Sequence, residues 1–149
     1  MAYENPLGVY SFLASTGLKQ YQFVSLNAAG VLIDPTTLGD AIGVLVSSGT
    51  TGSTGKAGST TSGYYHSVQC YGIAKVLAAS TLIDPGMRIA ACTTGAEIGW
   101  AIDGSDNAAL FGLGFAVTAV RSTGGDSTGS GVELVSVLLK TIGQGSTVA

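Results

Sequence analysis

Short apolar stretches separated by turn residues run through most of the chain, and they predict β-strands. Residues 21–26 alternate like a half-buried strand, residues 27–30 read Asn-Ala-Ala-Gly, and the apolar pattern resumes at 31–35. We therefore expect a hairpin in this part of the chain. Residues 41–46 form a further short apolar segment, in which Gly43 indicates a bulge or a close backbone contact.

Two longer apolar segments follow farther along the chain. Residues 64–76 are rich in aromatic and β-branched side chains, which predicts one long strand or two strands joined at Gly72. Residues 132–139 give the clearest strand pattern of the sequence. Alanine-rich pieces at 74–80 and 105–110 have the composition for one short helical turn each, so we expect little helix.

The region from 81 to 117 echoes the first half of the chain. Residues 85–91, followed by Thr94 and Gly95, parallel residues 18–30, and residues 112–117 parallel the segment at 41–46. The tetrapeptide Leu-Ile-Asp-Pro occurs at 32–35 and again at 82–85. Because it stands at different points of the two patterns, it is not a clean marker of a repeat.

These segments together predict an all-β fold, a small antiparallel barrel or sandwich with little helix. Residues 1–17 are interrupted by Pro6, Gly8 and Gly17, and we interpret them as an N-terminal arm that a partner surface orders. Residues 18–149 form a single β-rich domain, with flexible Gly/Ser/Thr loops at 47–63 and 122–131.

Composition and charge exclude several classes of protein. The chain has 149 residues, 23 of them Gly, and is 46% hydrophobic and 10% charged, which disfavours both helical bundles and disorder. Six Lys and Arg residues are scattered singly and the net charge is −3, so we expect no binding to nucleic acid. The longest apolar run, residues 108–120, is too short for a membrane span, and no signal peptide is visible, so we expect a protein made in the cytoplasm.

Patterns typical of catalysis are weak in this sequence. The stretch around Lys56 lacks the first Gly and the final Ser or Thr of a phosphate-binding loop. Residues 125–129 match Gly-x-Ser-x-Gly around Ser127, but they lie in a low-complexity loop without a strand-to-helix turn. His66 is the single imidazole and is expected to be structural, so we predict no enzyme and no catalytic residue.

Candidate ligand sites are equally sparse. Cys70 and Cys92 are expected to be ordinary buried thiols, and two Cys with one His are too few for a metal site. Asp103 and Asp106 are expected to form a polar turn rather than a calcium site. Trp100, beside Glu97, is either a core or interface anchor or a sugar platform. We predict neither a metal nor a cofactor.

The chain resembles the capsid decoration, or cement, proteins of tailed phages, of the lambda-like head decoration type. The resemblance covers residues 18–140 and rests on a set of segments: Gly-Leu-Lys-x-x-x-Phe-Val-x-Leu at 17–26, Ala-Ile-Gly-Val-Leu at 41–45, residues 71–76, Pro-Gly-Met-Arg-Ile at 85–89, Gly-Leu-Gly-Phe-Ala at 112–116, and 131–139. It implies a β-tulip-like fold. The loop at 47–63 departs from the compact pattern of that family.

This resemblance implies a structural virion protein on the outer surface of an icosahedral head. Such proteins clamp neighbouring major capsid protein subunits, commonly as homotrimers at three-fold and quasi-three-fold sites, and bind neither nucleic acid nor membrane. Their N-terminal arm often pairs with capsid strands. The arm residues with suitable side chains here are Tyr3, Leu7, Val9, Tyr10 and Phe12. Deletion of residues 2–13 is expected to abolish capture by heads and to leave the fold intact.

Two other classes remain open. The high Ser/Thr content and Trp100 favour a bacterial surface or secreted β domain, such as an adhesin or carbohydrate-binding module. A small hydrolase that uses Ser127 and His66 is the third class, and Ser127→Ala would abolish its activity.

Overall fold

The computed structural model describes residues 5–36, 40–47, 60, 63–79, 82–104, 112–121 and 133–139. This part of the chain consists of strands and one short 3-10 turn, η1 (Gly95–Glu97), which confirms the predicted all-β class. No helix within these ranges is long and apolar enough to cross a membrane. The strands are β1 (Asn5–Leu13), β2 (Phe23–Leu26), β3 (Leu32–Ile33), β4 (Gly43–Leu45), β5 (Tyr65–Leu77), β6 (Leu82–Ile83), β7 (Arg88–Ala91), β8 (Ala101–Asp103), β9 (Gly114–Ala116), β10 (Val120–Arg121) and β11 (Leu134–Leu139).

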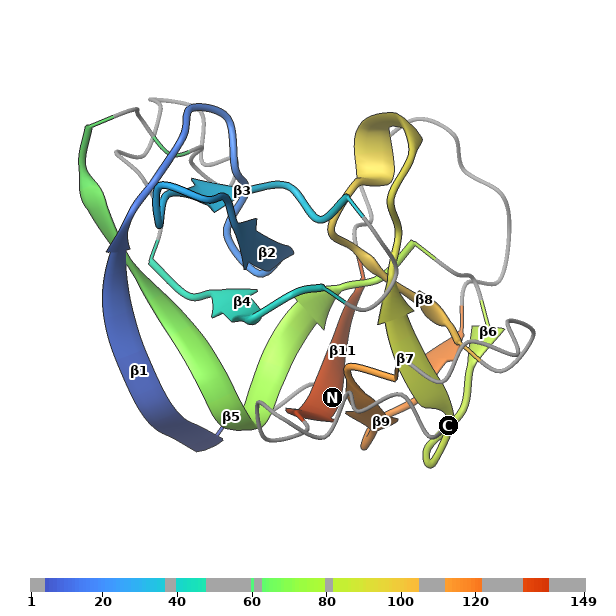
Figure 1. Ribbon diagram of the computed structural model, residues 1–149. Coiled ribbons are helices and arrows are strands. Elements are labelled where there is room, and N and C mark those ends of the chain that lie inside the picture. The colour runs from blue at the N-terminus through green and yellow to red at the C-terminus, as the bar shows by residue number, and fades with distance from the viewer. Residues whose placement is uncertain are drawn as a thin grey trace, which may run out of the picture.

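Strand β5 runs through the whole molecule and bends in its middle, so that its two halves belong to two lobes (Figure 1). The bend falls at Gly72, whose φ of +89° is open to glycine and strained for other residues. The buried Gln69 side chain donates hydrogen bonds to the carbonyls of Tyr71 (3.1 Å) and Ile73 (3.0 Å), one on each side of the bend. The sequence therefore encodes one strand with a fixed kink.

The first lobe is a small barrel. Its strands follow the order β1, β5, β4, β2 and β3, and an isolated parallel bridge between Ala14 and Leu32 closes the circle behind β1. We call this lobe barrel 1. Its interior is filled by Ala14, Leu18, Val24, Leu32, Leu45, Val68 and Cys70.

The second lobe, barrel 2, repeats this arrangement. The second half of β5 is followed by β11, β9, β7 and β8, and a parallel bridge between Ala78 and Ala101 closes the circle. The short pair of β6 and β10 lies beside it. Its core contains Ala74, Val76, Ile83, Ile89, Ala91, Ala101, Ala116, Val120, Val135, Val137 and Leu139.

The two barrels correspond residue by residue, and the sheet order reads the same from both ends: β3-β2-β4-β5 and β8-β7-β9-β11. Tyr21 N donates to Leu45 O at 2.7 Å, and Gly86 N donates to Ala116 O at 2.7 Å. In the same way, Ala14 N binds Tyr64 O and Ala78 N binds Glu133 O. The structure thus confirms the internal echo in the sequence.

The correspondence also settles which segments match. Residues 41–46 lie at the same places as 112–117, and residues 20–26 at the same places as 85–91. The two Leu-Ile-Asp-Pro tetrapeptides fall at different places, because residues 32–33 form β3 whereas residues 82–83 form β6. As expected, the tetrapeptide does not mark the repeat.

Most of the local predictions agree with the structure. The hairpin at 21–35 is present as β2 and β3, and a Cβ on Gly43 would lie 2.3 Å from Gln69 O, which is the predicted close backbone contact. The helical turn expected at 74–80 is wrong for residues 74–77, because they continue β5. Pairing with β11 and burial of the small side chains override their helix propensity there. Residues 105–110 and nearly all of the predicted loops at 47–63 and 122–131 lie outside the described residues.

Candidate interaction surface

Much of the predicted arm is a strand of barrel 1. Residues 5–13 form β1, which pairs antiparallel with β5 along its whole length, and Ala14 and Leu18 lie in the barrel core. The edge of β1 that faces β5 therefore forms its hydrogen bonds within the same chain. The expectation that residues 2–13 can be deleted without harm is therefore wrong, since the deletion would remove a wall of the barrel.

One backbone edge of β1 is turned away from β5. Ala14 N donates to Tyr64 O on the β5 side, whereas Ser15 N donates to Leu32 O on the other side. Because N–H directions alternate along a strand, those of residues 9, 11 and 13 point away from β5. Among the residues that the structure describes, β5 is the one strand that pairs with β1. An edge of this kind can accept an additional strand.

The predicted arm residues have different surroundings on this strand. Val9 and Tyr10 are 44% and 53% exposed, so both can contact a partner. Phe12 is half-buried against the barrel core. Tyr3 and the side chain of Leu7 lie outside the described residues. The contact role of all five stays a prediction.

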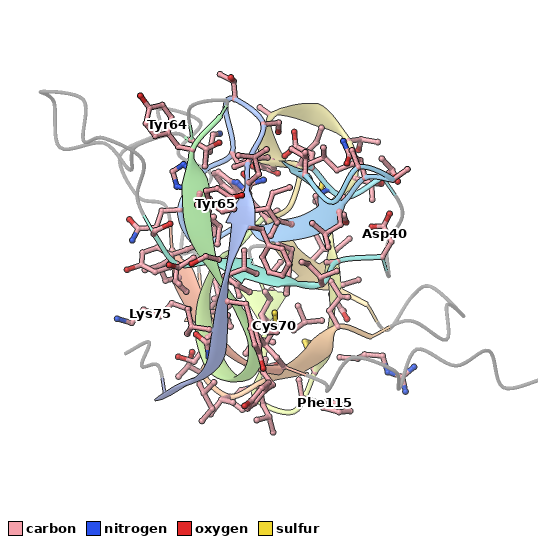
Figure 2. All side chains as sticks on the ribbon, turned by 60° about the vertical axis from the view of Figure 1, so that its left-hand side comes forward. Asp40, Tyr64, Tyr65, Cys70, Lys75 and Phe115 are labelled. Atoms are coloured by element: carbon pink, nitrogen blue, oxygen red, sulfur yellow. The ribbon has the colours of Figure 1, made fainter. Side chains whose placement is uncertain are left out.

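Two exposed tyrosines lie at the end of barrel 1 where β5 begins. Tyr64 and Tyr65 are 66% and 73% exposed, and Figure 2 shows them at one end of the molecule, with Phe115 at the other. In the sequence, these tyrosines indicate a strand and give no sign of an exposed surface. Their exposure follows from their position ahead of the first buried residue of β5, His66.

A second exposed apolar patch lies on the outer face of barrel 2. Phe115 of β9 is paired with Leu138 of β11 on one side and with Arg88 of β7 on the other. Phe115 and Leu138 are 40% and 47% exposed. We call these three residues the β9 patch. Sequence reasoning missed it, although Leu138 breaks the expected polar outer face of the strand at 132–139.

Of the residues weighed for catalysis, His66 is the one that the structure describes. His66 is buried, and its Nδ1 lies 3.3 Å from Ser47 Oγ, at the place where barrel 2 has the core residue Val135. The predicted structural role of His66 agrees with this position. Ser127 and Lys56 lie outside the described residues.

The thiols and carboxylates of the described residues form no ligand cluster. Cys70 is buried, which raises the pKa of its thiol, whereas Cys92 is half-buried and contacts Thr94 O. Within the described ranges no group of three or more His, Cys, Asp or Glu side chains is placed to hold a metal ion. Asp103 lies in β8, and Asp106 is outside those ranges.

Trp100 is a packing anchor between elements of both barrels. The Lys19 Nζ lies 5.2 Å from the centroid of its ring and donates to Ala96 O at 3.3 Å. Lys19 precedes β2 in barrel 1, and Trp100 precedes β8 in barrel 2. The cation over one face of the indole ring is typical of a cation–π contact.

Comparisons with known proteins place the fold. No protein-family model and no curated protein matches the chain. Among solved structures, the chain is similar to the N base of the head fiber protein gp8.5 of bacteriophage phi29. The TM-score is 0.53 at 17% sequence identity, and the match covers 89% of this chain and 93% of the other. The chain therefore has the fold of the base of a phage head fiber.

Proposed function

We propose that the protein is a structural component of a phage head that binds the outer surface of the shell and bridges neighbouring major capsid protein subunits. The observation that supports this proposal is the fold shared with the head fiber base across 89% of the chain. In the finer form of the proposal, the protein acts as a homotrimer at three-fold and quasi-three-fold sites, in the manner of the lambda-like decoration proteins. The proposal assigns no catalytic role, cofactor or metal to the chain.

The outer edge of β1 is the part of the surface best suited to the shell. The N–H groups of residues 9 and 11 point away from β5 and offer hydrogen bonds to an extended segment of a capsid subunit. Val9, which is 44% exposed, adds apolar area beside this edge. Several such contacts, one from each copy of a trimer, would add through their effective concentration.

The first experiment counts this chain in purified particles by quantitative mass spectrometry against the main shell protein. A copy number comparable to that of the shell protein supports a lattice-covering role. A few copies per particle would replace it with a fibre or vertex role. Complete absence would overturn the head-associated function and favour the surface-domain class.

The second experiment tests the β1 edge with purified protein and heads that lack it. Ser11→Pro removes one N–H on the outward side and leaves the pairing with β5 intact, because proline is tolerated where the N–H faces solvent. We expect at least a tenfold loss of affinity for heads, with a melting temperature near that of the wild type. Ser11→Ala, which keeps the N–H, should bind like the wild type. Equal binding by both variants would refute the role of this edge.

A further inference from the structure

The internal repeat exposes a surface on barrel 2 whose counterpart on barrel 1 is covered. Three residues on the outer face of barrel 1, Phe23, Val44 and Gln69, are at most 1% exposed. Phe23 and Val44 belong to the core cluster of barrel 2, although their chain neighbours Val24 and Leu45 face the interior of barrel 1. The outer wall of barrel 1 is therefore buried against barrel 2.

The residues at the corresponding places in barrel 2 are those of the β9 patch. Phe23 pairs with Val44, which directly follows Gly43 in β4, and Arg88 pairs with Phe115, which directly follows Gly114 in β9. Arg88 therefore corresponds to Phe23, and Phe115 corresponds to Val44. Leu138 corresponds to Gln69 by its pairing with Phe115. The same wall that is buried in barrel 1 carries two large apolar side chains in barrel 2, Phe115 and Leu138, which are 40% and 47% exposed.

Two backbone hydrogen bonds define the contact between the barrels. Phe23 N donates to Gly99 O at 2.7 Å, and Leu77 N donates to Tyr21 O at 2.8 Å. The groups of barrel 2 equivalent to Phe23 N and Tyr21 O are Arg88 N and Gly86 O. The groups of barrel 1 equivalent to Gly99 O and Leu77 N are Gly30 O and Leu13 N. The turn and loop hydrogen bonds of the described residues engage none of these four groups.

The wall of barrel 2 that carries Phe115 and Leu138 and the end of barrel 1 that carries Leu13 N and Gly30 O lie at opposite ends of the molecule. The Leu13 end of β1 is paired with Tyr65, and in both views it lies far from Phe115 and β9 (Figures 1 and 2). One surface is the β9 patch; the other, which we call the open end of barrel 1, comprises Tyr10, Leu13 and Gly30. Tyr10 is 53% exposed there, whereas Ala74, at the corresponding place in barrel 2, is fully buried. A contact between these surfaces has to join two different molecules.

We propose that the β9 patch of one copy binds the open end of barrel 1 of a second copy, and so repeats between molecules the contact that joins the two barrels within one. The Arg88 N–H would donate to Gly30 O, and the Leu13 N–H to Gly86 O, across this interface. The contact is head to tail, and it closes into a ring when the rotation between copies divides a full circle. This contact specifies the interface of the homotrimer in the proposed function. It rests on the homotrimer alone and not on binding to the shell.

Gly30 provides a sharp test of this geometry. A Cβ at Gly30 meets no atom within 4 Å in the isolated chain, but a Cβ at the corresponding Gly99 would lie 2.7 Å from Phe23 O. Gly30→Asn should therefore be tolerated by the monomer, since Asn accepts a positive φ, and should block the interface. Gly95→Asn is the matched control, because Gly95 has the same φ of +75° and the same open surroundings.

The opposite surface is tested by Phe115→Glu with Leu138→Glu. Leu82→Glu is its control, because Leu82 of β6 is a leucine that is also exposed (58%, against 47% for Leu138) and lies outside the β9 patch. The masses of all variants are measured by analytical ultracentrifugation of the purified full chain over a range of concentrations. We expect the wild type and both controls to associate, and each interface variant to bind itself roughly 100-fold more weakly, since it loses buried apolar area or gains a backbone clash.

An equimolar mixture of Gly30→Asn with the Phe115→Glu, Leu138→Glu double variant distinguishes head-to-tail from symmetric contact. One intact end remains on each partner, so the mixture should form a one-to-one dimer and nothing larger. A wild type that stays monomeric at about 100 μM, variants that associate like the wild type, or a mixture that stays monomeric would each overturn the proposal. Head binding by Ser11→Pro is read separately, so failure of either proposal can be recognised without the other.

Discussion

Two glycines at corresponding places of the repeat have almost identical surroundings. An added Cβ at Gly43 would lie 2.3 Å from Gln69 O and 2.8 Å from Val68 Cγ1. At Gly114 it would lie 2.3 Å from Leu138 O and 2.8 Å from the Cγ1 of a valine on the neighbouring strand. The clash is with a backbone carbonyl of the paired strand, which cannot rotate away. Substitution by Ala therefore forces the strand itself to move.

The cost of this movement can be worked from the distances. A carbonyl at 2.3 Å must retreat by about 1 Å to reach ordinary van der Waals contact. Overpacking of this size costs about 1–3 kcal/mol, and the displaced strand weakens one or two hydrogen bonds worth about 1 kcal/mol each. We expect Gly43→Ala and Gly114→Ala each to lower the free energy of unfolding by about 3 kcal/mol.

The control is Gly86→Ala, which tests backbone strain without a clash. Gly86 has a φ of +87° and no atom within 4 Å of an added Cβ, so the expected cost is about 1–2 kcal/mol. Urea and thermal unfolding, followed by circular dichroism, should give melting temperatures lower by roughly 6–12 °C for the two clashing variants and by less for the control. The reasoning fails if either clashing variant is as stable as the control, or if their losses differ by more than about 1 kcal/mol.

Three further predictions concern buried or half-buried polar groups. Burial raises the pKa of the Cys70 thiol above its ordinary 9.0, so the unfolded chain loses this proton first and stability falls as the pH rises above about 9. Cys70→Ala should remove that slope when unfolding is measured as a function of pH. Thiol-specific labelling of the native protein should be faster at Cys92, which is half-buried, than at the buried Cys70. Gln69→Met removes the two hydrogen bonds that the side-chain amide donates at the bend of β5. It should lower the free energy of unfolding by about 2 kcal/mol in urea titrations, and an unchanged value would contradict the role of Gln69 in fixing the kink. Ser47→Ala and Thr118→Val each remove a hydroxyl that accepts a backbone N–H at 2.9 Å, and equal losses of about 1 kcal/mol in thermal unfolding are expected if the two places are equivalent.

The strands could be predicted from the sequence because local patterns encode them. The turn at 27–30, the apolar run at 41–46 and the β-branched segment at 64–76 each form the expected element. The echo between 41–46 and 112–117 was visible because both segments keep a small residue followed by apolar ones. These signals depend on neighbouring residues, which a single sequence shows directly.

The repeat as a whole was hidden because equivalent places carry different chemistry. Tyr21 and Gly86 both adopt a positive φ, although a tyrosine there gives no local signal of such a turn. Gln69 and Leu138 occupy equivalent places with opposite polarity, because one side chain fixes a bend and the other is exposed. The arm was likewise misread, since its pairing with β5 joins residues far apart in sequence.

The bend in β5 explains why one chain carries two barrels rather than two separate domains. Gly8 in β1 and Gly72 in β5 occupy equivalent places and both have positive φ, so the first strand of each barrel begins at a glycine kink. At Gly8 the kink is followed by one barrel, whereas at Gly72 it joins the last strand of barrel 1 to the first strand of barrel 2 without a linker. A shared strand fixes the position of each barrel relative to the other, and this forces the outer wall of barrel 1 onto barrel 2. Within the described residues the repeat ends at β11, where the same wall carries the partly exposed Phe115 and Leu138, and the proposed contact with a second copy would bury these two side chains.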